Sequence, residues 1–194
     1  MGEVISVISG KGGTGKTTVC AAVASCLAAE GSRVLCIDAD IGLRNLDIAL
    51  GMAELPVLAF TEVLEGNFTL MDATAHPELD KLFLLTAPSR AGDRSVSPAA
   101  FAMLLHDARE EFDYVLIDSA AGIGDSFRLA TDSADRCVIV LSVTARPWIR
   151  PLPGVRSSSS LTESYPAPSC GLMRAHPHQI FRYGEPQVSW RGFT

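Results

Sequence analysis

The segment "SGKGGTGKTT" at residues 9–18 carries the residue types and spacing that point most directly to chemistry. From Gly10 to Thr17 it fits the pattern GxxxxGK[ST], in which the backbone N–H groups of a glycine-rich loop surround the phosphates of a nucleotide. In such a loop Lys16 reaches the β- and γ-phosphate oxygens, and the Thr17 hydroxyl binds Mg²⁺. The pattern follows a strand-like run and precedes a helix-like one, which favours a phosphate-binding loop over a glycine-rich turn with incidental lysines.

Three aspartates follow at the ends of two apolar runs and could support a metal ion. "CIDAD" carries Asp38 and Asp40, and "VLIDS" places Asp118 after three apolar residues, the arrangement of an aspartate that orients the shell of Mg²⁺. Because ligand groups gather at the carboxyl ends of parallel strands, all three carboxylates are expected to face one crevice. An isolated Asp-x-Asp more often forms a turn at the exit of a strand, but the phosphate-binding loop upstream favours the site.

Lys11 is a second lysine at the start of the same loop, although a phosphate-binding loop needs only one. The loop backbone is already directed at phosphate, so the Lys11 side chain is expected to project away from the nucleotide that it flanks. One interpretation is an ordinary solvated lysine. The other is that Lys11 reaches the nucleotide of a second subunit and adds positive charge beside the γ-phosphoryl group. The spacing alone does not decide between these interpretations.

The residues of this site must be held by strands and helices, and the hydrophobic pattern indicates where these lie. Near-continuous apolar runs with β-branched residues predict buried strands, and small or apolar residues at helical spacing predict helices. A strand, a loop, a helix and a second strand in this order form the right-handed unit of a parallel sheet. Strands that are apolar on both faces indicate that helices cover both faces of the sheet. The predicted strands are 3–9, 33–40, 81–87, 114–122 and 137–144, and the predicted helices are 17–31, 58–66 and 97–111.

Composition narrows the class of protein. The chain has 194 residues, of which 47% are hydrophobic, enough for one domain with a sizeable core. Its formal net charge of −6 disfavours a nucleic-acid partner. The five cysteines show no metal-ligand spacing with the four histidines, and Cys36 and Cys137 lie in apolar runs typical of buried thiols, which favours a reducing compartment. Neither a signal peptide nor an apolar run long enough to cross a bilayer is visible, so a cytoplasmic location is expected.

The character of the chain changes abruptly after Thr144. Seven of the eleven prolines lie in residues 145–194, together with a run of four serines from Ser157 to Ser160. Apolar periodicity is lost there, and this composition is typical of a linker or a disordered segment. The sequence therefore predicts two parts, an incomplete α/β domain at residues 1–144 and a disordered tail rich in Pro, Ser and Arg at residues 145–194.

Residues 11–17, "KGGTGKT", resemble the deviant Walker A motif of the MinD/ParA family of ATPases, in which the early lysine is the signature residue. The segment "DADIGLRNLDIALG" at 38–51 is similar to switch I of the MinD branch, and "VLIDSAAGIG" at 115–124 is similar to its Walker B and switch II segments. The resemblance covers about residues 3–144. It implies the fold of a P-loop NTPase, with a mostly parallel sheet, helices on both faces, and the C-terminal part of the fold missing or replaced.

The resemblance also implies a role for each matching residue. The implied catalytic residues are Lys11, which reaches across an ATP-sandwiched homodimer, Lys16, which contacts the phosphates, and Asp40, which positions the attacking water. Gly122 senses the γ-phosphate through its backbone N–H, and Asn45 lies near the dimer surface. The implied Mg²⁺ set is Thr17, Asp38 and Asp118. The implied ATP-binding set is Gly10, Lys11, Gly12, Gly13, Thr14, Gly15, Lys16, Thr17, Thr18 and Gly122.

In the family, ATP binding and hydrolysis drive a dimerisation switch in placement of the bacterial division site. The resemblance therefore implies hydrolysis of ATP to ADP and phosphate, with MinC and MinE as partners and peripheral attachment to the cytoplasmic face of the cell membrane. A flagellar-number regulator, a partition ATPase of the same superfamily, and a nucleotide-binding module without turnover remain alternatives.

The end of the sequence departs from the family pattern. Members attach to membranes through a C-terminal amphipathic helix, and none is expected here because Gly184 and Pro186 interrupt the last residues. Members also continue through further strands and helices beyond the segment that matches residues 137–144. The changed composition after that point is that of either a lineage-specific tail or an out-of-frame translation.

Overall fold

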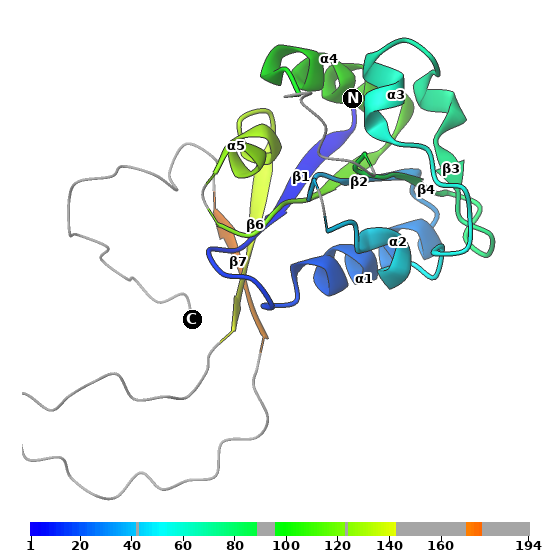
Figure 1. Cartoon of the computed structure of the whole chain (residues 1–194). Helices are drawn as coiled ribbons and strands as arrows, with labels where there is room; N and C mark the ends of the chain where they lie inside the picture. The colour runs from blue at the N-terminus through cyan, green and yellow to red at the C-terminus, as the bar shows by residue number, and fades with distance from the viewer. Residues whose placement is uncertain (42, 89–95, 123, 143–169, 176–194) are drawn as a thin grey trace, which may run out of the picture.

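A mostly parallel sheet runs through the computed structural model, which describes residues 1–41, 43–88, 96–122, 124–142 and 170–175 (Figure 1). Its strands are β1 (Glu3–Ile8), β2 (Val34–Asp38), β3 (Thr74–Ala75), β4 (Leu82–Leu85), β5 (Tyr114–Asp118), β6 (Arg136–Ser142) and β7 (Cys170–Ala175). Their order in the sheet is β3-β4-β2-β5-β1-β6-β7. The five inner strands are parallel, while β3 is antiparallel to β4 and β7 is antiparallel to β6.

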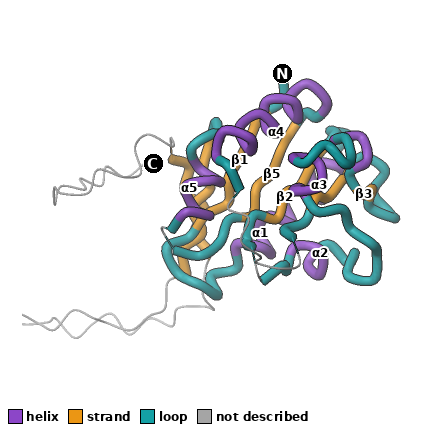
Figure 2. Tube along the Cα trace, turned by 45° about the horizontal axis from the view of Figure 1, so that its top comes forward, coloured by secondary structure: helices purple, strands orange, loops and turns teal. Residues whose placement is uncertain are grey.

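Helices cover both faces of this sheet, as the two views show (Figures 1 and 2). One face carries α1 (Lys16–Ala29) and α2 (Leu46–Ala49). The other face carries α3 (Phe60–Leu64), α4 (Pro98–Glu111) and α5 (Asp125–Thr131), and a short 3-10 helix, η1 (Leu70–Asp72), follows α3. The predicted α/β fold, with a mostly parallel sheet between two layers of helices, is confirmed.

Alternating residues of the inner strands build a separate core on each face. In β2, Leu35 and Ile37 face the core under α4, whereas Cys36 faces the core under α1. Phe60 of α3 and Phe101 of α4 meet edge to face in the first core, with ring centroids 5.5 Å apart. Because successive side chains of a strand point to opposite faces, a strand buried on both sides reads as a continuous apolar run. This is why the apolar runs located the inner strands.

The two long helices begin in different ways, and the difference bears on the site. α4 starts with the predicted Ser97–Pro98 pair, and the Ala100 N–H donates a hydrogen bond to the Ser97 Oγ at 3.5 Å. α1 starts after Gly15, which has a left-handed φ of 91° and makes no side-chain cap. The first N–H groups of α1 are therefore not occupied by a capping side chain and can bind a ligand.

The ends of several elements differ from the sequence-based prediction. The strands predicted at 33–40 and 114–122 end earlier, at Asp38 and Asp118, and the residues beyond them form loops. α2 and α5, with 4 and 7 residues, lie where no helix was predicted. Helices this short show too few periodic positions for a pattern to be recognised, and tertiary packing rather than local propensity stabilises them.

β7 lies inside the tail for which the composition predicts disorder. It pairs with β6 from Ser142 opposite Cys170 to Cys137 opposite Ala175, so for these residues the structure differs from the prediction. The physical reason is that the edge of a sheet presents unpaired backbone groups to any extended segment, whatever its side-chain pattern. The remainder of the tail lies outside the described residues, and the division of the chain at residue 144 stays a prediction.

Candidate functional site

The phosphate-binding loop joins the end of β1 at Ile8 to the start of α1 at Lys16, as the motif predicts. Gly13 and Gly15 have φ angles of 73° and 91°, a conformation that glycine adopts without the steric cost of a Cβ. The loop leads directly into the N-terminus of α1, where the helix dipole attracts negative charge. The backbone thus forms an anion site before any side chain is considered.

A cavity of about 360 Å³ lies at this helix N-terminus. Predicted site residues that line it are Gly12, Gly13, Gly15, Lys16, Thr17, Thr18 and Asp40. Asn45, expected near a dimer surface, lines it as well. The predicted site residues that are not among the lining residues are Gly10, Lys11, Thr14, Asp38, Asp118 and Gly122. The structure thus brings most of the predicted phosphate-binding set to one cavity.

The cavity also has apolar walls that the sequence did not identify. They are formed by Leu43, Ile48, Ala49 and Ala121. Leu43 and Ile48 are 68% and 63% exposed, which is unusual for large apolar side chains. No signal in the sequence distinguishes an apolar residue on a binding wall from one in the core, so these residues could only be found from the structure.

The order of the strands brings the two strand-end aspartates together. β5 lies between β1 and β2, so Asp118 is in register with Val7 of β1 on one side and with Asp38 of β2 on the other. Asp38 is fully buried and Asp118 is 2% exposed, while the ammonium-bearing Lys16 is 8% exposed. A buried cation and two buried carboxylates therefore meet at the edge of the sheet that carries the loop.

Burial dominates the electrostatics of the three carboxylates. It raises the pKa of Asp118 to about 7, opposed by a hydrogen bond from the Thr17 hydroxyl and by the charge of Lys16, while Asp38 adds to the rise. Burial likewise raises the pKa of Asp38, although backbone hydrogen bonds oppose it. Burial also raises the pKa of Asp40, opposed by Lys16. The cluster holds more negative charge than Lys16 balances, so it favours an added cation.

The residues present fit Mg²⁺. The Asp118 Oδ1 atom is buried without a hydrogen-bond partner, and the Thr17 hydroxyl lies within hydrogen-bond reach of the same carboxylate. Among the described residues no three His, Cys, Asp or Glu side chains form a metal-binding group. The fit rests on the Asp118 carboxylate and the Thr17 hydroxyl, since Mg²⁺ is commonly bound by one or two carboxylates together with nucleotide phosphates and water.

Asp38 has a different environment from Asp118. Its Oδ1 accepts the Asp40 N–H at 2.9 Å, and its Oδ2 accepts the N–H groups of Asn45 and Leu46, both at 3.1 Å. Both oxygens are therefore engaged by the loop that leads from β2 to α2. The structure shows Asp38 as the anchor of this loop, a function that the motif alone did not indicate.

Ser9 connects the phosphate-binding loop to the segment after β5. The Ser9 Oγ donates a hydrogen bond to the Lys11 carbonyl oxygen at 2.7 Å. The Ser9 carbonyl oxygen accepts the Gly122 N–H at 3.2 Å, and Gly122 has a left-handed φ of 98°. The Lys11 side chain is exposed. The Gly122 N–H would have to break its hydrogen bond to the Ser9 carbonyl oxygen before it could donate to a phosphate.

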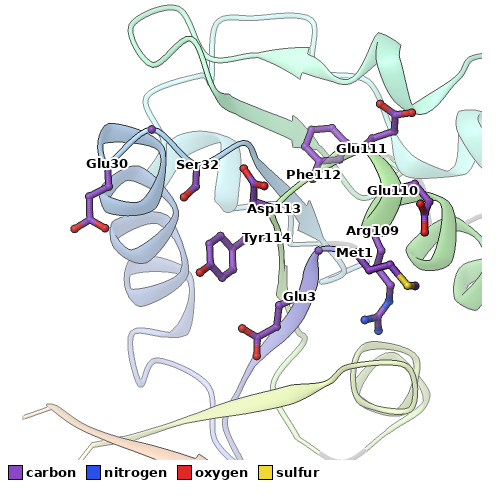
Figure 3. A pocket seen from close by; sticks show the side chains of 12 residues that line it. Met1, Glu3, Glu30, Ser32, Arg109, Glu110, Glu111, Phe112, Asp113 and Tyr114 are labelled. Carbon is purple, nitrogen blue, oxygen red and sulfur yellow. The ribbon is translucent and has the colours of Figure 1, made fainter.

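A larger cavity, of about 620 Å³, lies at the opposite edge of the sheet, at the amino ends of β1 and β5 (Figure 3). Arg109 is the one arginine or lysine among its described lining residues, and this arginine forms an ion pair with Asp135. The acidic lining residues, labelled in the figure, are Glu3, Glu30, Glu110, Glu111 and Asp113. This excess of carboxylates disfavours a triphosphate in this cavity.

Known proteins are similar to this chain in sequence and in fold. The sequence profile of a family described as an AAA domain matches residues 2–148. The chain belongs to this family of ATPases. The matched residues include all the described strands except β7. They also include the glycine-rich loop, the strand-end carboxylates and the residues that line the cavity.

Within the AAA domain, the similarity is to MinD, as the motifs predict. The septum site-determining protein MinD of Thermotoga maritima is 43% identical over 141 residues, which are 72% of this chain and 52% of that protein. The MinC:MinD cell division protein complex of Aquifex aeolicus matches with 37% identity and a TM-score of 0.63, covering 71% of this chain and 55% of that chain. MinD of Pyrococcus horikoshii, solved with Mg-ADP, matches with 30% identity and a TM-score of 0.63, covering 72% and 57%.

The chain spans about half the length of the curated relatives it matches. Within the described residues, no helix has the length and apolar character needed to span a bilayer.

The stability of the metal-free domain is expected to fall as the pH rises from 5 to 7. Between the ordinary aspartate value of 3.8 and the folded pKa of about 7, folded Asp118 keeps a proton that the unfolded chain has lost. The free energy of unfolding therefore falls by up to about 1.4 kcal/mol per pH unit, and Asp38 and Asp40 act in the same direction. Urea unfolding in EDTA across this range measures the slope. An Asp118→Asn chain should show a flatter profile, and an unchanged slope in that variant would contradict the assignment.

Proposed function

We propose that the chain is a MinD-type ATP-binding and ATP-hydrolysing switch, which dimerises on ATP and acts in placement of the bacterial division site. The observation that carries the proposal is the different placement of two lysines from one loop. Lys16 is 8% exposed and lines the cavity, whereas Lys11 is exposed and lies outside its lining. The buried lysine serves the nucleotide of its own chain, and the exposed lysine is available to the nucleotide of a second copy.

The loop and the start of α1 bind the phosphates in this proposal. The N–H groups of Gly12, Gly13 and Gly15 face the triphosphate, with Thr14 and Gly10 shaping the loop, and Lys16 donates to the β- and γ-phosphate oxygens. Thr17 and Asp118 would hold Mg²⁺, with Asp38 supporting them through the loop that it anchors. Bound Mg²⁺ neutralises phosphate charge in the transition state.

Asp40 orients the attacking water. Asp40 lines the cavity, and its carboxylate would accept a hydrogen bond from water placed in line with the γ-phosphoryl group. Burial raises the Asp40 pKa, and the positive charge of Lys16 opposes this rise. Lys11 of the second copy adds positive charge at the same γ-phosphoryl group.

ATP then acts as a bridge whose removal separates the copies. Hydrolysis releases the γ-phosphate, Gly122 returns to the Ser9 carbonyl, and the ADP-bound chains no longer share a nucleotide. The MinC:MinD structure from Aquifex aeolicus supports a MinC-type protein as partner of the dimer. MinE as an activator and peripheral attachment to the cytoplasmic face of the membrane are further parts of the proposal.

Nucleotide-dependent sizing tests the proposal. With Mg²⁺ and the slowly hydrolysed analogue ATPγS, light scattering should give about twice the chain mass of 20.6 kDa, and with ADP it should give the mass of one chain. Lys11→Ala should remain a single chain in both, because the positive charge that crosses the interface is lost.

Lys81→Ala is the matched control for this measurement. Lys81 is also exposed, but its ammonium donates to the Gly31 carbonyl oxygen at the opposite edge of the sheet, so this variant should dimerise as the parent chain does. A parent chain that stays single with ATPγS would refute the dimerisation switch.

A further inference from the structure

Ser9 is a buried serine that does not line the nucleotide cavity and yet contacts two segments of the site. It is 1% exposed, its hydroxyl donates to the Lys11 carbonyl oxygen, and its own carbonyl oxygen accepts the Gly122 N–H. We propose that Ser9 is a positioning residue, whose hydroxyl orients the Lys11–Gly12 peptide so that the Gly12 N–H faces the terminal phosphate of ATP. The proposal rests on the proposed function, since it concerns the nucleotide of that site.

The planarity of the peptide unit connects the Ser9 hydroxyl to the Gly12 N–H. A trans peptide directs its C=O and N–H to opposite sides. The hydrogen bond of 2.7 Å holds the Lys11 carbonyl toward the buried Ser9, so the N–H of the same peptide unit is directed away from it. Gly12 lines the cavity, whereas Ser9 and Lys11 do not, so an N–H directed away from Ser9 is available to the cavity. The Ser9 hydroxyl thereby controls the direction of a donor that it does not itself touch.

Glycine at position 12 makes such control necessary. Without a Cβ, Gly12 adopts positive and negative φ with similar ease, so the Lys11–Gly12 peptide can turn over at little cost. The surroundings of Gly12 do not restrict it either. A Cβ added at Gly12 would make only an ordinary van der Waals contact, 3.9 Å from the Ala121 Cβ. The hydrogen bond from Ser9 is the described contact that selects one of the two orientations.

The location of Gly12 indicates which phosphate is affected. Gly12 lies against Ala121, beside Gly122 and on the side of the site where β5 ends at Asp118. In the proposed function Gly122 senses the γ-phosphate, whereas Lys16, for the β- and γ-phosphates, and Thr17, for Mg²⁺, lie at the other end of the loop, at the start of α1. A donor at Gly12 is therefore placed for the γ-phosphate, which ATP carries and ADP lacks.

Binding of two nucleotides to matched variants tests the proposal. Titration calorimetry with Mg²⁺ would measure the affinity of the parent chain, Ser9→Ala and Ser9→Thr for ATPγS and for ADP. Ser9→Ala should bind ATPγS roughly 3- to 10-fold more weakly, the effect of one lost hydrogen bond, and should bind ADP within about twofold of the parent. Ser9→Thr keeps the hydroxyl and should restore the discrimination. Repeating the titrations in a Lys11→Ala background removes any contribution from dimerisation.

Ser6→Ala, in the strand β1 that leads to Ser9, provides the control. Ser6 is fully buried, and its hydroxyl has no hydrogen-bond partner, so its removal should leave both affinities unchanged. If the added methyl group in Ser9→Thr disturbs the packing, the comparison of Ser9→Ala with Ser6→Ala still tests whether the Ser9 hydroxyl is needed for binding of ATPγS. Equal losses of ATPγS and ADP binding, no loss at all, or failure of Ser9→Ala to fold would each overturn the positioning role. A parent chain that binds neither nucleotide would instead refute the proposed function and remove the basis of this inference.

Discussion

Lys16→Ala is expected to weaken the binding of ATP and ADP by roughly 100-fold or more. The Lys16 ammonium lines the cavity and is only 8% exposed, so water screens it poorly. Charge-assisted hydrogen bonds contribute roughly 1.5–3 kcal/mol each, and this ammonium is placed to donate to two phosphate groups. Titration calorimetry or a fluorescent ADP analogue would measure the change in dissociation constant.

The specificity of this loss can be checked with the other lysines of the chain. Lys11→Ala and Lys81→Ala remove the same charge from exposed positions and should leave ADP affinity within about threefold of the parent value. ADP affinity that survives in Lys16→Ala would mean that the cavity at the start of α1 is not the phosphate site.

Asp40→Asn is expected to lower the rate of ATP hydrolysis by roughly 100-fold or more, the scale on which a positioned acid or base contributes. Asparagine has nearly the same shape but lacks the negative charge that orients the attacking water. Binding should change much less, because the N–H groups of the loop and the Lys16 ammonium stay in place. Phosphate release would measure the rate, and titration with ADP would measure the binding.

Asp80→Asn is a suitable control for Asp40→Asn, since Asp80 is exposed and lies outside the lining of the cavity. Its rate should match that of the parent chain. If the parent, Asp40→Asn and Asp80→Asn all show the same background rate, the chain binds nucleotide without turnover, and the enzymatic part of the proposal fails.

Much of the local structure was predictable from short segments of the sequence. The glycine-rich loop was located because Gly13 and Gly15 stand where the backbone needs a left-handed φ, a requirement that residue type alone can show. β2 and β5 were located because strands buried on both faces need continuous apolar residues, and the structure shows five buried residues in β2. The start of α4 was located because Ser97 can accept a hydrogen bond from the first turn of a helix, and Pro98 has the φ angle that a first helical residue needs.

Which residues meet at the site could not be predicted, because it depends on contacts between segments that are distant in the sequence. Asp118 meets Asp38 because β5 inserts between β1 and β2, and no local pattern contains the order of strands. The engagement of both Asp38 oxygens by backbone N–H groups depends on the course of the loop to α2. Leu43 and Ile48 were missed because apolar residues look the same on a cavity wall and in a core.

By itself, the sequence determined the phosphate-binding loop, the strand-end carboxylates and the alternation of strands and helices, since residue type and spacing within a few positions specify backbone conformation and burial. The tertiary structure decided which carboxylates lie together, how Ser9 connects Lys11 to Gly122, and which apolar residues line the cavity at the start of α1. These features depend on packing between segments far apart in the sequence, such as Asp38 with Asp118 and Ser9 with Gly122, and the free energy of such contacts is not contained in any short segment.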